Sequence, residues 1–285
     1  MQDTPQEENT YVFDAESAAE MARLIAQDLL VTKYMGGLLP ENPAFIGIKR
    51  VLDVACGPGG WTIEVAFAHP DVEVVGIDIS HTMIEYARTQ AKVQGLSNAR
   101  FLVMDATRPL DFPDDYFDLV NLRGAVGFMS PTAWPNFVRE AVRISHSGGM
   151  IRLTECDDMG TTSSPAFEKL SAMGSAAFLR AGRSFSPEGR NWGLTPMLAR
   201  FLREAGCKNI QQRAHVIDYS AGTEAHDGMF HNWMISLKFT QPFLVRMGSA
   251  TQEELDNLYQ QALAEMMADD FSALWYFLTV TGEKP

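Results

Sequence analysis

The sequence predicts an α/β fold with a doubly wound, mostly parallel, seven-stranded sheet and helical insertions. First, short apolar runs alternate with amphipathic stretches over residues 51–155, as strands joined by helices do. Second, a small-residue loop separates the first apolar run from the amphipathic stretch that follows it. Third, an acid ends successive strands, at the edge where a parallel sheet binds its ligand.

Length and composition allow one large core with smaller additions. The chain has 285 residues, 46% of them apolar, which is enough for a full globular core. Its apolar runs fall short of the roughly 18 residues that a membrane-spanning helix needs. The polar first residues do not resemble a signal peptide. We therefore expect a cytoplasmic protein that does not interact with membranes.

Charge and cysteine content argue against a nucleic-acid-binding protein and against a protein held together by disulfides or a C-x-x-C metal site. The formal net charge of −13 repels phosphate backbones, so we expect no nucleic-acid partner. The three cysteines, Cys56, Cys156 and Cys207, are widely spaced and predict neither a disulfide framework nor a C-x-x-C metal site. Asp157 and Asp158 leave magnesium open as an alternative, but the expectation is no metal.

The loop after the first predicted strand, residues 51–55, is the strongest local signal. Gly57, Gly59 and Gly60 lack a Cβ atom, so a ligand can lie against the main chain there. Trp61 and Thr62 follow, so the third glycine of the dinucleotide fingerprint is missing. The acid at the strand end, Asp53, disfavours a pyrophosphate and favours a ligand with a cationic end.

Further acids end the second and third predicted strands, residues 72–78 and 99–104. Asp78 can accept hydrogen bonds from both hydroxyls of a ribose. Asp105 can accept one from the exocyclic amine of an adenine. Ser80 is the predicted N-cap of the helix that follows the second strand. A fourth strand is expected over residues 116–122 and a fifth over residues 148–155.

A predicted helix over residues 14–30 precedes this unit. Asp14 is its expected N-cap, and the apolar stripe consists of Ala18, Met21, Ile25 and Leu29. Because the helix comes before the first strand, we expect it to cover the core as a cap.

These residues together resemble class I S-adenosylmethionine-dependent methyltransferases. The resemblance covers residues 50–158 and implies a Rossmann-like core. The motifs, in the order of that family, are Asp53 with Gly57-x-Gly59, Gly76-Ile77-Asp78-Ile79-Ser80, Met104-Asp105-Ala106, Phe117-Asp118-Leu119-Val120 and Gly148-Gly149.

The resemblance implies a cofactor, S-adenosyl-L-methionine, and the residues that bind it. Asp78 would hold the ribose, Ile79 and Met83 would pack on the adenine, and Asp105 and Ala106 would bind the adenine edge. The methionine part would lie among Asp53, Ala55, Cys56, Gly57, Gly59, Asn121 and Leu122. Ala55 stands where the family motif has a glycine, which loosens the fit of the loop. After the fourth strand the chain has Asn121-Leu122-Arg123-Gly124 instead of [ND]-P-P-[YF], which disfavours methylation of a nucleobase amine.

Additions to this core divide the chain into segments. We expect an N-terminal helical cap over 1–46, the cofactor-binding core over 47–158 and a helical insertion over 159–190. The core continues over 191–220, a second helical insertion covers 221–270, and the last core strand lies in 271–285. The cap and both insertions flank the same sheet edge and are expected to form an apolar acceptor chamber.

The expected function is methyl transfer to a small, largely apolar acceptor, at oxygen, carbon or nitrogen, in secondary metabolism. The cap also resembles that of bacterial natural-product methyltransferases, which leaves a homo-oligomer through this helix open. The candidate acceptor residues are Tyr11, Tyr34, Glu155, Asp157, His231 and Trp233, and no catalytic residue is assigned. An NAD-dependent dehydrogenase and a cofactor-binding protein without turnover are the alternatives.

Overall fold

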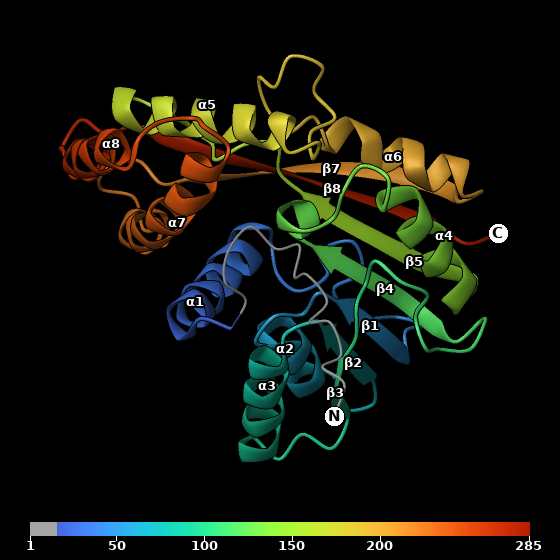
Figure 1. The fold of residues 1–285 in the computed structure, drawn as a ribbon. Helices are drawn as coiled ribbons and strands as arrows, with labels where there is room; N and C mark the ends of the chain where they lie inside the picture. Colours follow the sequence, from blue (N-terminus) through green and yellow to red (C-terminus); the bar gives the residue numbers. More distant parts are fainter. Residues whose placement is uncertain (1–15) are drawn as a thin grey trace, which may run out of the picture.

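The computed structural model describes residues 16–285, which form one sheet with helices on both faces (Figure 1). The strands are β1 (Arg50–Val54), β2 (Glu73–Asp78), β3 (Ala99–Val103), β4 (Phe117–Arg123), β5 (Ser145–Glu155), β6 (Thr161–Thr162), β7 (Lys208–Asp218) and β8 (Ala273–Glu283). The helices are α1 (Ala18–Tyr34), α2 (Gly60–Ala68), α3 (His81–Val93), α4 (Trp134–Ile144), α5 (Pro165–Arg180), α6 (Thr195–Glu204), α7 (His226–Arg246) and α8 (Gln252–Met266), with a 3-10 turn η1 (Ala125–Gly127).

The predicted doubly wound, mostly parallel sheet is confirmed. The strand order is β3-β2-β1-β4-β5-β8-β6, and β7 also pairs with β8. Strands β1 to β5 are mutually parallel, and β8 runs antiparallel to β5, β6 and β7. The predicted number of strands was seven, whereas the described residues form eight. The additional strand is β6, whose Thr161 and Thr162 pair with Leu274 and Ala273 inside the stretch predicted as a helical insertion.

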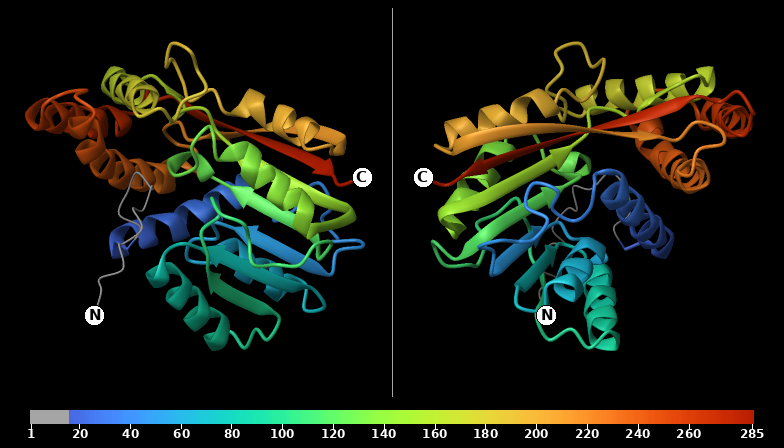
Figure 2. Two further views of the ribbon diagram at one scale, coloured as in Figure 1. Left: turned by 45° about the vertical axis from the view of Figure 1, so that its right-hand side comes forward. Right: turned by 180° about the vertical axis from the view of Figure 1, so that it is seen from behind.

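Two helical layers bury the faces of the sheet (Figures 1 and 2). On one face α2 and α3 cover β1 to β3, and Trp61 and Val65 of α2 are buried against Val51 of β1. On the other face α4 packs on β5 and α6 packs on β7 and β8, with Trp134 of α4 stacked on Phe201 of α6 at a centroid distance of 6.0 Å. Side chains of a strand alternate between the faces, so odd-numbered positions of β1, including Asp53, point toward α2.

The loop between β1 and α2 uses left-handed backbone conformations. Gly59 has φ +82°, and a Cβ atom there would lie 2.7 Å from the Phe101 ring and 2.8 Å from the Ala87 side chain, so only glycine fits. Ala55 also has a positive φ, 55°. A residue with a Cβ atom is strained in this region, which is why the family motif has glycine there. The alanine therefore keeps the shape of the loop at a cost in backbone strain.

Helix α1 begins later than predicted. Ser17 is its N-cap and accepts a hydrogen bond from the Glu20 backbone N–H, while the expected cap Asp14 lies outside the described residues. The helix packs against α7 (Figure 1), and Arg23 donates to Asn232 of α7 at 2.9 Å. Arg23 also forms a buried ion pair with Glu20 at 2.6 Å. Polar as well as apolar contacts thus fix the helix to the fold.

Helices α5, α7 and α8 form a separate apolar cluster against β8, beyond the carboxyl ends of β1, β2 and β4 (Figure 2). The stretch predicted as the second helical insertion, residues 221–270, contains α7 and α8. Aromatic rings form the centre of the cluster: Trp233 lies 5.4 Å from Phe167 and 4.8 Å from Trp275 between ring centroids.

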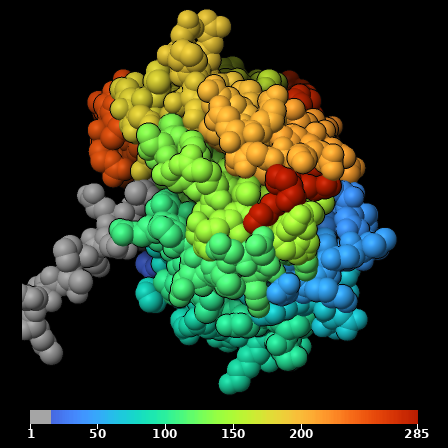
Figure 3. Space-filling model, turned by 90° about the vertical axis from the view of Figure 1, so that its right-hand side faces the viewer, coloured from blue at the N-terminus to red at the C-terminus, as the bar shows by residue number. Residues whose placement is uncertain are grey.

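The end of the chain is part of the sheet. Lys284 exchanges backbone hydrogen bonds with Gly148 and Gly149 at 2.9 Å, and its ammonium donates to the Ser145 carbonyl. Figure 3 shows the last residues at the surface between β5 and the segment of α6 and β7. Over residues 16–285, no helix combines the length and the apolar character that crossing a membrane requires.

Candidate functional site

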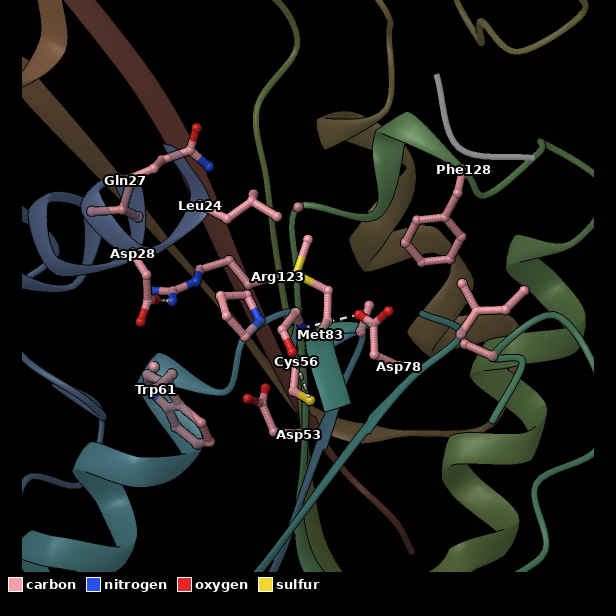
Figure 4. A pocket seen from close by; sticks show the side chains of 18 of the residues that line it. Leu24, Gln27, Asp28, Asp53, Cys56, Trp61, Asp78, Met83, Arg123 and Phe128 are labelled. Carbon is pink, nitrogen blue, oxygen red and sulfur yellow. Dashed lines mark hydrogen bonds and ion pairs between the residues drawn. The ribbon is translucent and has the colours of Figure 1, made fainter. Parts of the chain in front are cut away.

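A cavity lies between the carboxyl ends of β1, β2 and β4 and helix α1, which covers it (Figure 4). The sequence placed a ligand at this edge because parallel strands end there. The structure brings Asp53, Ala55, Cys56, Gly57, Asp78, Ile79, Met83, Asp105 and Ala106 together as lining residues. Gly59, Asn121 and Leu122 are not in the lining: Leu122 is fully buried, and Gly59 shapes the loop from behind.

Asp78 links the loop to the second strand. Its carboxylate accepts hydrogen bonds from the backbone N–H groups of Gly57 and Ser80, both at 2.9 Å. Burial raises the pKa of Asp78, although these backbone donors act in the opposite direction. Each carboxylate oxygen can accept a second hydrogen bond, so the side chain can still bind a pair of ligand hydroxyls.

Asp53 is deeper in the site, with 4% of the residue exposed. It accepts hydrogen bonds from Thr62 Oγ1 at 2.7 Å and from Asn121 Nδ2 at 2.8 Å. Burial raises the pKa of Asp53 to about 6, so the carboxyl group is ionised at neutral pH. The floor of the cavity therefore carries a buried negative charge.

The outer end of the cavity is formed by the segments after β2 and β3. Met83 of α3 is buried there, and the N-cap Ser80 accepts a hydrogen bond from its backbone N–H at 3.1 Å. Asp105 accepts hydrogen bonds from the Thr107 backbone N–H at 2.8 Å and from the Thr107 hydroxyl at 2.7 Å. This carboxylate also forms an ion pair with Arg108 at 3.3 Å.

The sequence predicted that the N-terminal helix covers the core, but it identified neither the residues of α1 that line the cavity nor Arg123. Arg123 projects from the end of β4 toward Asp28 of α1, with which it forms an ion pair, and donates to Thr32 Oγ1 at 2.9 Å (Figure 4). Burial, together with the nearby Arg152, lowers the pKa of Arg123 to about 9. A signal was present in the sequence, because the lining residues of α1 have helical spacing: Arg23, Leu24, Gln27, Asp28 and Val31.

None of the candidate acceptor residues among the described positions lines the cavity. Tyr11 lies outside the described residues, and Tyr34 packs against the cluster of α5, α7 and α8. His231 is exposed on α7. Trp233 is 4% exposed and lies inside the same cluster, because its ring packs between Phe167 and Trp275.

The two candidate acids after β5 bind backbone groups of neighbouring turns. Asp157 accepts hydrogen bonds from the backbone N–H groups of Leu194, at 2.6 Å, and Thr195, at 2.9 Å, at the start of α6. Glu155 accepts one from the Ala125 N–H of η1 at 2.6 Å. Glu155 therefore holds η1, whose neighbours Gly124 and Phe128 line the cavity, whereas Asp157 holds the start of α6. Across residues 16–285, no three His, Cys, Asp or Glu side chains are grouped so that they could hold a metal ion.

The buried Glu155 is expected to make the stability of the folded protein depend on pH. Burial raises the pKa of Glu155 from 4.5 in the unfolded protein to about 8 in the folded protein. The contribution of this group to the free energy of unfolding is therefore fully present below pH 4.5 and is lost as the pH rises through about 8. The variant Glu155→Gln lacks this ionisation. Its free energy of unfolding, relative to wild type, should therefore increase between pH 4.5 and about 8 and then level off.

Urea unfolding of both proteins at several pH values measures this difference. The variant Glu253→Gln makes the same chemical change at an exposed position of α8 and is the matched control. A Glu155→Gln difference that is the same at every pH would show that Glu155 is ionised in the folded protein.

Comparison with known proteins agrees with this geometry. The family model described as "Methyltransferase domain" matches residues 51–149, which run from β1 into β5 and include the loop and Asp78. Over these residues the chain is similar to that family. The resemblance to class I methyltransferases is confirmed.

Curated relatives of the chain carry methyltransferase names as well. Over 103 residues, the chain is 35% identical to a demethylmenaquinone methyltransferase of Geobacillus kaustophilus, covering 36% of this chain and 43% of that protein. Methyltransferase pytC of Aspergillus terreus is 24% identical over 252 residues, covering 83% of this chain and 72% of that protein. The chain thus spans less than half of the first relative.

Likeness to a solved structure extends over nearly the whole fold. The structure of phosphoethanolamine N-methyltransferase 2 from Haemonchus contortus superposes with a TM-score of 0.54 at 17% sequence identity, covering 95% of this chain and 57% of that chain. At this identity the likeness concerns the fold, which is the Rossmann-like methyltransferase fold.

Proposed function

We propose that this protein is an S-adenosylmethionine-dependent methyltransferase acting on a small, largely apolar acceptor. The observation that carries the proposal is the position of Asp78. Its carboxylate lines the cavity at the end of β2 and is held against the Gly57 loop, inside the part of the chain that matches the methyltransferase domain. A carboxylate there can accept hydrogen bonds from both ribose hydroxyls of the cofactor.

Charges in the cavity support a cationic cofactor. Four carboxylates line it, those of Asp28, Asp53, Asp78 and Asp105, against two guanidinium groups, those of Arg23 and Arg123. The local excess of negative charge favours a ligand with a sulfonium and an ammonium group over one with a pyrophosphate. This supports S-adenosylmethionine over a nicotinamide dinucleotide.

The acceptor would approach from the side of α1. Apolar side chains face the cavity there, from α1, from the segment after η1 and from β8: Leu24, Val31, Phe128 and Phe277. These side chains can exclude water and bind an apolar molecule. The two insertions contribute no described residue to the cavity lining, so α1 supplies most of the expected chamber.

Methyl transfer requires little covalent chemistry from the protein. The bound cofactor supplies an activated methyl group on its sulfonium sulfur. Asp78 and the loop would orient the cofactor, and α1 and Phe128 would hold the acceptor in line and keep the site dry. The relatives named demethylmenaquinone methyltransferase and malonyl-[acyl-carrier protein] O-methyltransferase act on different acceptors, so they do not select one. A role in secondary metabolism and an oligomer through α1 stay predictions.

Calorimetry with the purified protein tests the proposal. We expect S-adenosylmethionine and S-adenosylhomocysteine to bind and NAD not to bind. With apolar hydroxyl, enol or amine compounds as acceptors, S-adenosylhomocysteine should form only when an acceptor is present, and the acceptor should gain the mass of one methyl group. Binding of NAD in place of S-adenosylmethionine would support a dehydrogenase, and binding without turnover of any acceptor would support a non-catalytic role.

A further inference from the structure

Three polar side chains form a row across the sheet under the candidate cofactor site. In the strand register, Asp53 of β1 is opposite Asn121 of β4, and Asn121 is opposite Arg152 of β5. Residues opposite each other in neighbouring strands point to the same face and lie close enough for their side chains to interact. Sequence order separates them widely, so the sheet alone brings them together.

Hydrogen bonds connect the three side chains of this row. Arg152 Nη1 donates to Asn121 Oδ1 at 2.9 Å, and Asn121 Nδ2 donates to Asp53 Oδ1 at 2.8 Å. At its far end Arg152 Nε donates to Glu41 Oε2 at 3.3 Å. Arg152 and Asn121 are each only 1% exposed. Only Asp53 of the row reaches the cavity.

The guanidinium group fixes the orientation of the amide between the two charges. Arginine has only donors, so Asn121 must turn its oxygen to Arg152, and its two N–H groups then face the other way. A carboxylate has only acceptors, so Asp53 needs this N–H. With Arg152 absent, the amide could rotate and present its oxygen to the carboxylate, which would repel it.

The surroundings of Asp53 include few other charges. Thr62 of α2 and Asn121 of β4 donate hydrogen bonds to it. Arg152 of β5 is the cation that acts on it and lowers its pKa, whereas Asp78 of β2 raises it. The Cys56 thiol also lies near these two carboxylates, and its pKa is raised well above its usual range. Arg152 is thus the main positive group opposing the burial of Asp53.

We propose that Arg152 is a positioning residue of the cofactor site: through Asn121 it holds the Asp53 carboxylate oriented and ionised toward the cationic end of the cofactor. The inference rests on the proposed function. It explains why a fully buried arginine, a costly residue to desolvate, stands beneath the sheet edge that binds the ligand.

The test compares Arg152→Met with Arg152→Lys. S-Adenosylmethionine, which is cationic at sulfur and nitrogen, and 5′-methylthioadenosine, which has neither charge, are titrated by calorimetry between pH 5.5 and 8. We expect Arg152→Met to weaken binding of S-adenosylmethionine at least tenfold at pH 7 and to change binding of 5′-methylthioadenosine less than twofold. The affinity of the wild-type protein for S-adenosylmethionine should fall as the pH drops below about 6. In Arg152→Met this fall should begin at a higher pH. Arg152→Lys should restore part of the loss.

A second variant and a ligand-free measurement complete the design. Asn121→Ala removes the amide that links Arg152 to Asp53 but keeps Arg152. If Arg152→Met fails to fold, Asn121→Ala should still weaken binding of S-adenosylmethionine and leave binding of 5′-methylthioadenosine nearly unchanged. Carbon-13 NMR titration of the Asp53 carboxyl group in the free protein should show a higher pKa in Arg152→Met than in wild type.

Equal loss of both ligands, or an unchanged pKa of Asp53, would overturn the inference and leave Arg152 as a structural residue. If wild type binds no S-adenosylmethionine, the proposed function fails, whereas the NMR titration still decides whether Arg152 controls Asp53.

Discussion

Replacement of Asp78 by alanine is expected to weaken binding of S-adenosylmethionine by roughly 1.5 to 3 kcal/mol, about 10- to 150-fold. The variant loses the charge-assisted hydrogen bonds to the ribose. It also frees the Gly57 and Ser80 N–H groups that the carboxylate holds at 2.9 Å, so the loop loses its link to β2. Calorimetric titration of folded variant and wild type measures the change.

The control is Asp71→Ala, in the exposed turn before β2, which alters the net charge by the same amount. It should bind the cofactor as wild type does. Wild-type affinity in Asp78→Ala would contradict the assignment of the ribose site. Equal weakening in both variants would attribute the effect to net charge.

Replacement of Trp233 by alanine is expected to cost about 3 to 5 kcal/mol of unfolding free energy, as truncation of a buried tryptophan does. Its ring packs on Phe167 and Trp275 and joins α7 to α5 and β8. From the sequence Trp233 was a candidate acceptor residue. Because it lies outside the cavity lining, folded Trp233→Ala should keep the wild-type KM for the acceptor.

Urea unfolding measures the cost, and the matched control is Phe67→Ala, whose aromatic side chain on α2 is 69% exposed. This control should change the free energy of unfolding by less than about 0.5 kcal/mol. A stable Trp233→Ala with a raised KM would restore the assignment to the acceptor site.

The core of the fold could be predicted from the sequence because its signals are local. Strand length, the glycine loop and the acids at the ends of the first three strands are each read from a few neighbouring residues, and parallel strands joined by helices have few topologies available. The same local signals located the ends of β1, β2 and β3, where Asp53, Asp78 and Asp105 face one cavity. The match to the methyltransferase domain confirmed the family that these motifs indicated.

Boundaries and strand pairing at the additions were less predictable. The pairing of Thr161 and Thr162 with β8 joins residues more than 100 positions apart, and two residues carry no periodic signal. The start of α1 at Ala18 also depended on which of two capping residues, Asp14 or Ser17, the chain uses.

The sequence by itself determined the type of sheet, the order of the motifs and the carboxylates at the strand ends, because each depends on residues close together in the chain. Tertiary structure alone decided which side chains share a space. It determined which side chains of α1 face the cavity, paired Asp28 with Arg123, buried Trp233 in the helical cluster and aligned Asp53, Asn121 and Arg152 in one row. The physical reason is that strand register and helix packing depend on contacts between distant segments, and a linear pattern records which faces are apolar but not which faces meet.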